Sequence, residues 1–172
     1  MSKPRDLKGF GGGGPSRAVS LHVFMSAVFR FLTIATFLIL AAANQTAALW
    51  ATSGILAGAP AGWIFGSVES RWIASDLLTA ELSKAGRRRF LLNFAAVAPF
   101  LAGGAFAWVV ATVGWQNPLV GAEIGFASFL YAGSMACVSS LALVKTFKRL
   151  EAESGRIVWV VSDWLGNAYA IR

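Results

Sequence analysis

Four residues able to do chemistry fall within or beside apolar segments: His22, Arg30, Glu123 and Cys137. With a single His and a single Cys, the chain by itself can form neither a disulfide nor a zinc or bis-histidine haem site. No hydrolase, metalloprotease or dinucleotide motif is present, and Gly11–Gly14 lacks the Lys and Ser or Thr that complete a phosphate-binding loop. We therefore predict a non-enzymatic protein without a metal or cofactor.

The two charged candidates stand out because a charge inside hydrocarbon is costly. Arg30 lies two to three turns into the first apolar segment, where we expect its side chain to extend to the headgroups, or else to bind a lipid phosphate or a partner's charge. Glu123 lies near the outer end of the last apolar segment. It either reaches water at a helix N-terminus or contributes to transport.

The elements that position these residues follow from composition. Of 172 residues, 56% are hydrophobic and only 13% are charged, which is about half the charged fraction of a soluble domain. Asp, Glu, Lys, Arg and His are absent from runs of 38, 33 and 21 residues, at Phe31–Val68, Phe90–Ala122 and Ile124–Val144. About 20 apolar residues cross a bilayer. The sequence therefore predicts an all-α integral membrane protein with four transmembrane helices in two hairpins, at about 21–43, 47–68, 90–113 and 119–144.

The first apolar segment has one alternative interpretation. Phe31–Leu40 followed by Ala41–Ala43 also fits the apolar core and small-residue cleavage site of a removable leader.

Orientation follows from the basic residues, which give the chain a net charge of +7. Four precede the first predicted helix, five lie between the second and third, five follow the fourth, and neither short turn contains any. Under the positive-inside rule, both termini and the middle loop are cytoplasmic, in a multi-pass protein of the cell inner membrane. This placement of charge argues against a nucleic-acid partner. Trp63 and Trp72 would lie near the inner membrane boundary, and Trp50 near the outer one.

The predicted organisation has five parts. They are a flexible basic N-terminal tail (1–20), a first transmembrane hairpin (21–68), a cytoplasmic amphipathic helix with a basic collar (69–89), a second transmembrane hairpin (90–144) and a cytoplasmic C-terminal tail (145–172). The collar residues Arg87, Arg88 and Arg89 are suited to anionic lipid headgroups or to a partner protein. In the C-terminal tail, Ile157–Val161 predicts a small hairpin or a surface helix that leans on the membrane or a partner.

The most specific pattern is a stripe of glycines on the second predicted helix. Gly54, Gly58, Gly62 and Gly66 recur every four residues, so they share one helix face on which another backbone can come close. The fourth predicted helix has a similar stripe, made of Ser128, Ala132, Ala136 and Ser140. Such faces serve packing within one chain, an interface between subunits, or, least often, the lining of a pore.

These observations predict a small membrane subunit that packs, through the glycine stripe and its C-terminal tail, into a larger inner-membrane assembly of secretion, conjugation or respiratory type. Its expected partners are the lipid bilayer, anionic headgroups and other membrane subunits, of the same or a different chain. The alternative is a small oligomeric transporter or channel, in which Glu123 would be the candidate transport residue.

Overall fold

The computed structural model describes residues 16–43, 45–80, 82–83, 118–163 and 166–172. Within these ranges the protein is mostly helical, with helices α1 (Ala18–Ala43), α2 (Gln45–Ala80) and α4 (Pro118–Ser154). All three contain a stretch long and apolar enough to cross a membrane. They indicate a multi-pass membrane protein. The predicted helix at 90–113 lies outside the described residues.

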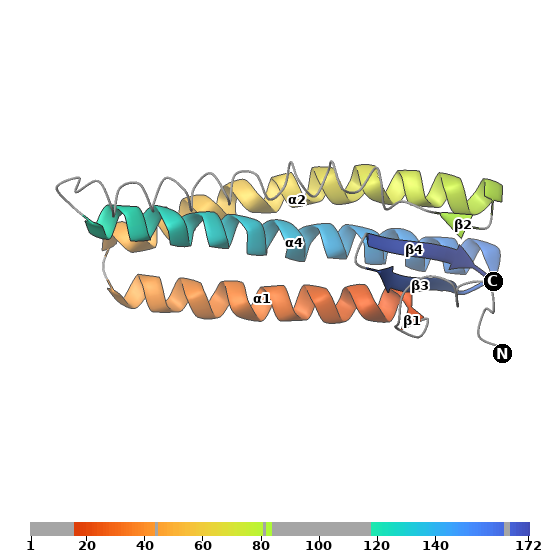
Figure 1. Cartoon of the computed structure of the whole chain (residues 1–172), viewed down its shortest axis with the longest axis horizontal. Coiled ribbons are helices and arrows are strands. Elements are labelled where there is room, and N and C mark those ends of the chain that lie inside the picture. The colour runs from red at the N-terminus through yellow and green to blue at the C-terminus, as the bar shows by residue number, and fades with distance from the viewer. Residues whose placement is uncertain (1–15, 44, 81, 84–117, 164–165) are drawn as a thin grey trace.

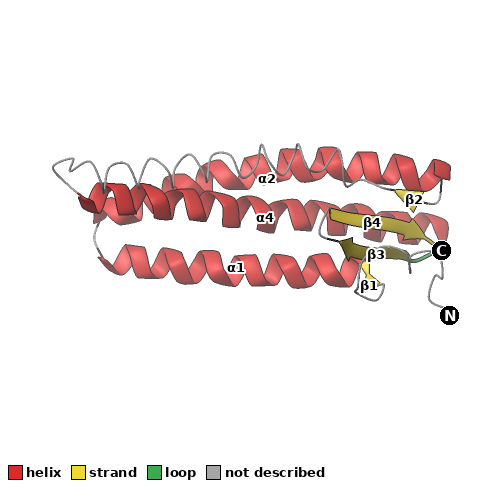
Figure 2. Ribbon diagram, viewed as in Figure 1, coloured by secondary structure: helices red, strands yellow, loops and turns green. Residues whose placement is uncertain are grey.

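At one end of this bundle, the strands that the structure describes form a single antiparallel sheet (Figures 1 and 2). The order is β1-β3-β4-β2, with bounds Ser16–Arg17, Val158–Asp163, Gly166–Ile171 and Leu82–Ser83. Since β1 leads into α1 while β2 and β3 follow α2 and α4, the sheet lies where α1 begins and where α2 and α4 end. The helix α1 therefore runs opposite to the other two.

The expectation of an all-α protein is corrected by this sheet. Of the two alternatives for the C-terminal tail, the structure has the hairpin, which pairs from Val158↔Ile171 to Asp163↔Gly166. An isolated hairpin is barely stable in water. Here its two outer edges pair with two-residue strands from distant parts of the chain, and its inner face packs on the chain's own helices.

Both α2 and α4 extend past the predicted ends of their spans. The residues from Val68 to Ala80, expected to include the start of a separate surface helix, continue α2 without a break. This segment contains neither glycine nor proline, and its apolar residues Ile73 and Leu77 are fully buried in the core near the sheet. The helix α4 likewise continues to Ser154 and stops at Gly155, whose positive φ of 65° and N–H bond to the Glu151 carbonyl form a helix-ending turn.

The largest core lies between the sheet and the helix ends, and combines residues from α1, α2, α4 and both long strands. Its biggest fully buried side chains are Tyr169 and Phe147. A smaller cluster at the opposite end joins the end of α1 to the start of α2 and to α4, through Leu40, Ala47, Ala51 and Leu130. Most of the large apolar side chains on α1 face outward, as expected of a helix in contact with lipid.

Candidate functional site

The glycine stripe of α2 lies directly on the backbone of α4. A Cβ atom at Gly62 would come within 2.8 Å of the Met135 Cα atom, and one at Gly66 within 2.7 Å of the Ser139 Cα atom. Cβ atoms at Gly54 and Gly58 would likewise overlap with backbone carbonyl oxygens of α4. The face is therefore already covered within this chain, and a side chain added at any of the four glycines would overlap with α4.

On α4, the residues whose backbone meets these glycines also recur every four positions. They are Ala127, Tyr131, Met135 and Ser139, each one residue before a member of the stripe expected from sequence. Of that stripe, Ser140 is buried, and Ser128, Ala132 and Ala136 are half-buried. Most of these close atoms are backbone atoms of α4, joined by the Ser134 hydroxyl at Gly58 and the Ala142 Cβ at Gly66. Because Tyr131 contributes its backbone carbonyl, a large residue can occupy this contact position.

The contact between α1 and α4 depends on side chains. The Ser26 hydroxyl lies 3.5 Å from the Cys137 thiol, and both residues are buried. Further from the sheet, about two turns along α1 from Ser26, the Thr33 hydroxyl faces Gly133. A Cβ atom added at Gly133 would come within 2.7 Å of this hydroxyl. The Thr33 hydroxyl has no hydrogen-bond partner among the residues that the structure describes.

A buried aromatic cluster joins α1, α4 and the sheet. The His22 Nε2 atom is 3.0 Å from the Tyr169 hydroxyl, which also accepts a hydrogen bond from the Asn167 side-chain amide at 3.3 Å. The Phe147 ring centroid lies 5.7 Å from that of His22 and 5.1 Å from that of Tyr169. In sequence, His22 offered no sign of this role, because its partners lie more than 120 residues away.

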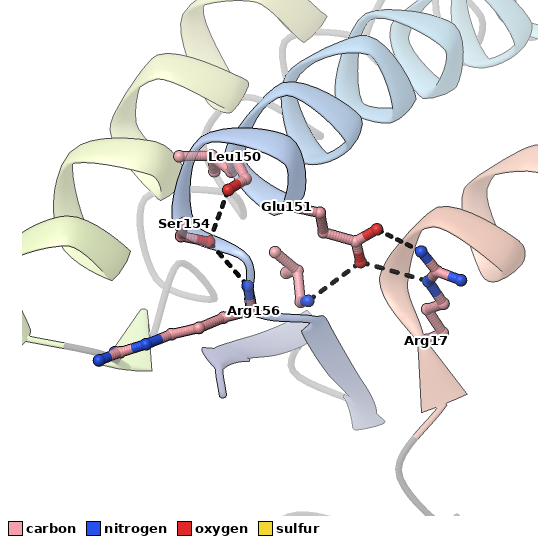
Figure 3. A network of polar contacts seen from close by, with 6 residues as sticks. Arg17, Leu150, Glu151, Ser154 and Arg156 are labelled. Atoms are coloured by element: carbon pink, nitrogen blue, oxygen red, sulfur yellow. Dashed lines mark hydrogen bonds and ion pairs between the residues drawn. The ribbon is translucent and has the colours of Figure 1, made fainter. Parts of the chain in front are cut away.

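A carboxylate of α4 ties two strands of the sheet to this helix (Figure 3). Glu151 accepts hydrogen bonds from Arg17 Nε at 3.3 Å and Nη2 at 2.5 Å, and from the Val158 backbone N–H at 3.1 Å. The hydrogen bond to Glu151 raises the pKa of Arg17 above its ordinary value, because the carboxylate stabilises the charged guanidinium. One residue thus links β1, α4 and β3.

Among the candidates that remain, Arg30 is the one whose side chain the structure describes. Arg30 is exposed on α1 and makes no hydrogen bond or ion pair with any residue that the structure describes. Arg87, Arg88 and Arg89 lie outside the described residues, and the Glu123 side chain is not among those described. No group of three His, Cys, Asp or Glu residues that could hold a metal occurs in the described part of the chain. The contacts of His22 and Tyr169 and those of Glu151 hold helices and sheet together.

Comparisons with protein-family models, with curated proteins and with solved structures found no match to this chain.

Proposed function

We propose that the protein is a non-enzymatic membrane subunit that holds a small sheet rigidly beside the bilayer as an attachment point for a larger inner-membrane assembly. The observation that carries the proposal is the shared core, in which α1, α2, α4 and the sheet bury the same cluster of residues. A sheet on a flexible linker would need no such core.

The depth of the bilayer can be proposed from helix lengths. Counting about 20 residues from the end of each helix opposite the sheet puts the second membrane boundary near Phe24, Phe65 and Val138. These three positions are consistent with the packing, since Ser26 faces Cys137 and a Cβ at Gly62 would meet Met135. The last 15 or so residues of α2 and of α4 then project about 22 Å beyond the hydrocarbon, carrying the sheet.

Charge and aromatic residues support this depth. The first charged residues beyond the proposed boundary are Glu69 on α2 and Lys145 on α4. The Lys145 ammonium lies 5.6 Å from the centroid of the half-exposed Trp63 ring, a pairing suited to the headgroup region. Because basic residues gather at this end, we propose that the sheet is cytoplasmic.

The fourth span is also part of the proposal. Ser83 lies at the sheet, whereas Pro118 lies at the opposite end of the bundle (Figure 1). The chain between them must return across the same distance as α4 covers, and it contains the uncharged run Phe90–Val113. We propose that this run crosses the bilayer, which gives four spans with both termini on one side.

Labelling of single cysteines tests the arrangement. In a Cys137→Ser background, Thr46→Cys marks the end of the bundle away from the sheet and Arg156→Cys marks the sheet end; both native residues are exposed. We expect a membrane-impermeant maleimide to label Thr46→Cys in intact cells, and Arg156→Cys only in inverted vesicles. Equal labelling of both sites in intact cells would refute the proposed topology.

Assembly is tested by mass in mild detergent. We expect the chain extracted from its native membrane to migrate with other subunits, and a free monomer alone would count against the proposal. The transporter alternative has less support, because the glycine faces are filled by α4 and so are not free to line a pore.

A further inference from the structure

Arg30 is a charged residue at an unusual depth. The packing of Ser26 beside Cys137 and of Thr33 beside Gly133 places Arg30 at about the level of Met135 on α4. The next charged residue of α4 toward the sheet is Lys145, ten residues away, or about 15 Å along the helix. The backbone of Arg30 thus lies well inside the apolar part of the bundle.

The direction of its side chain limits what it can reach. Side chains on a helix tilt toward the helix N-terminus, and the N-terminus of α1 is at the sheet. An extended arginine reaches about 6–7 Å by covalent geometry. From a position about 9 Å inside the proposed boundary near Phe24, the guanidinium reaches to about 3 Å inside that boundary. Local thinning of the bilayer around a buried arginine then brings a lipid phosphate into contact with it.

The surroundings of Arg30 favour a lipid over a protein carboxylate. Arg30 lacks an ionic partner within the described residues, while its outward neighbours are large exposed apolar side chains, including Phe31 at 72% and Ile34 at 52% exposure. Acyl chains fit such a surface. The exposed basic residues nearest the proposed boundary, Arg71 and Lys145, further attract anionic headgroups to this leaflet.

We propose that Arg30 holds the phosphate of an anionic phospholipid of the sheet-side leaflet, whose acyl chains lie along the outer face of α1. The guanidinium donates two parallel hydrogen bonds to the phosphate oxygens, which a lysine cannot reproduce. This inference rests on the proposed membrane placement, and it assigns α1 a bound lipid rather than a protein partner at this depth.

Native mass spectrometry of the full chain, released from bilayers of phosphatidylethanolamine and phosphatidylglycerol in equal parts, tests the inference. We expect the wild-type chain to retain phosphatidylglycerol, and Arg30→Gln to retain about fivefold less of it. This is the change expected when one basic residue near the headgroups is removed. Arg30→Lys should retain an intermediate amount. Lys148→Gln, which makes the same charge change at the sheet end, should retain the wild-type amount.

Three outcomes would overturn the inference: no lipid retained by the wild type, equal loss in Arg30→Gln and Lys148→Gln, or unchanged lipid in Arg30→Gln while a protein complex dissociates. Carbonate extraction of the same variants separates this failure from failure of the proposed function. A chain that stays in the membrane but retains no lipid refutes only the lipid site. A chain that carbonate removes refutes the membrane placement itself.

Discussion

The two contacts of α4 differ in what they are made of. Toward α2, glycines bring two backbones together over three turns, so the fit is fixed mostly by backbone atoms, which cannot rotate away. Toward α1, the contact uses Ser26, Thr33 and, near the sheet, His22, whose side chains have rotamers to choose from. The first contact is therefore expected to be intolerant of added volume, whereas the second is expected to depend on the volume and hydrogen bonds already present.

Phe147→Ala should have the largest effect, because it removes the ring that packs against both His22 and Tyr169. Truncation of a fully buried Phe costs about 3–5 kcal/mol. We expect a large drop in Tm in detergent, with faster hydrogen exchange in α1 and β4 but not in the glycine-bearing part of α2. Faster exchange that is uniform over all three helices would contradict a separate role for the α1 contact.

Gly62→Ala should have the second-largest effect on stability, and the regions with faster hydrogen exchange should be the reverse of those in Phe147→Ala. The new Cβ would meet the Met135 backbone, and overpacking of this kind costs about 1–3 kcal/mol. We expect exchange to rise along α2 and α4 and to stay low in β4. Gly133→Ala is the matched control, because its Cβ would meet only the Thr33 hydroxyl and the helix gains from alanine. Equal destabilisation by both substitutions would show that the two contacts do not differ.

Glu151→Gln should cost less than either core change. It removes the charge that holds Arg17 and weakens the acceptor for the Val158 N–H, so β1 should fray from β3. We expect faster exchange at Arg17 and Val158 with a small decrease in Tm. Arg149→Gln is the control, since its ion pair with Glu153 is exposed on both sides and should contribute nothing measurable.

Thr33→Ala should have the smallest effect, and in the stabilising direction. The buried hydroxyl has no partner among the described residues, and leaving a polar group in that state is unfavourable. We expect an unchanged or slightly higher Tm. In the double variant with Gly133→Ala the two changes should be non-additive, because the overlap is relieved. A clear loss of stability in Thr33→Ala would indicate that the hydroxyl has a partner after all.

Much of the helical part could be predicted from sequence, because long runs without charge have few other solutions. The predicted end of the first helix at residue 43 agrees with the structure, and the start of the fourth differs by one residue. The far ends of α2 and α4 could not be placed, since the hydrophobic pattern marks where a membrane ends and not where a helix ends. Beyond Val68 and Val144 the helices continue because no residue breaks them and a core is available to cover Ile73, Leu77 and Phe147.

The sequence alone determined that the chain contains membrane-length apolar segments, that its basic residues avoid the predicted short turns, and that α2 has a face without side chains. These are local properties, set by composition and by helical periodicity. Only the tertiary structure decided that this face meets Tyr131 and Met135 of the same chain, and that β1 and β2 complete a sheet with a hairpin more than 70 residues away. Two-residue strands and a His22–Tyr169 contact have no local signal, because their stability comes from neighbours that the fold alone brings together.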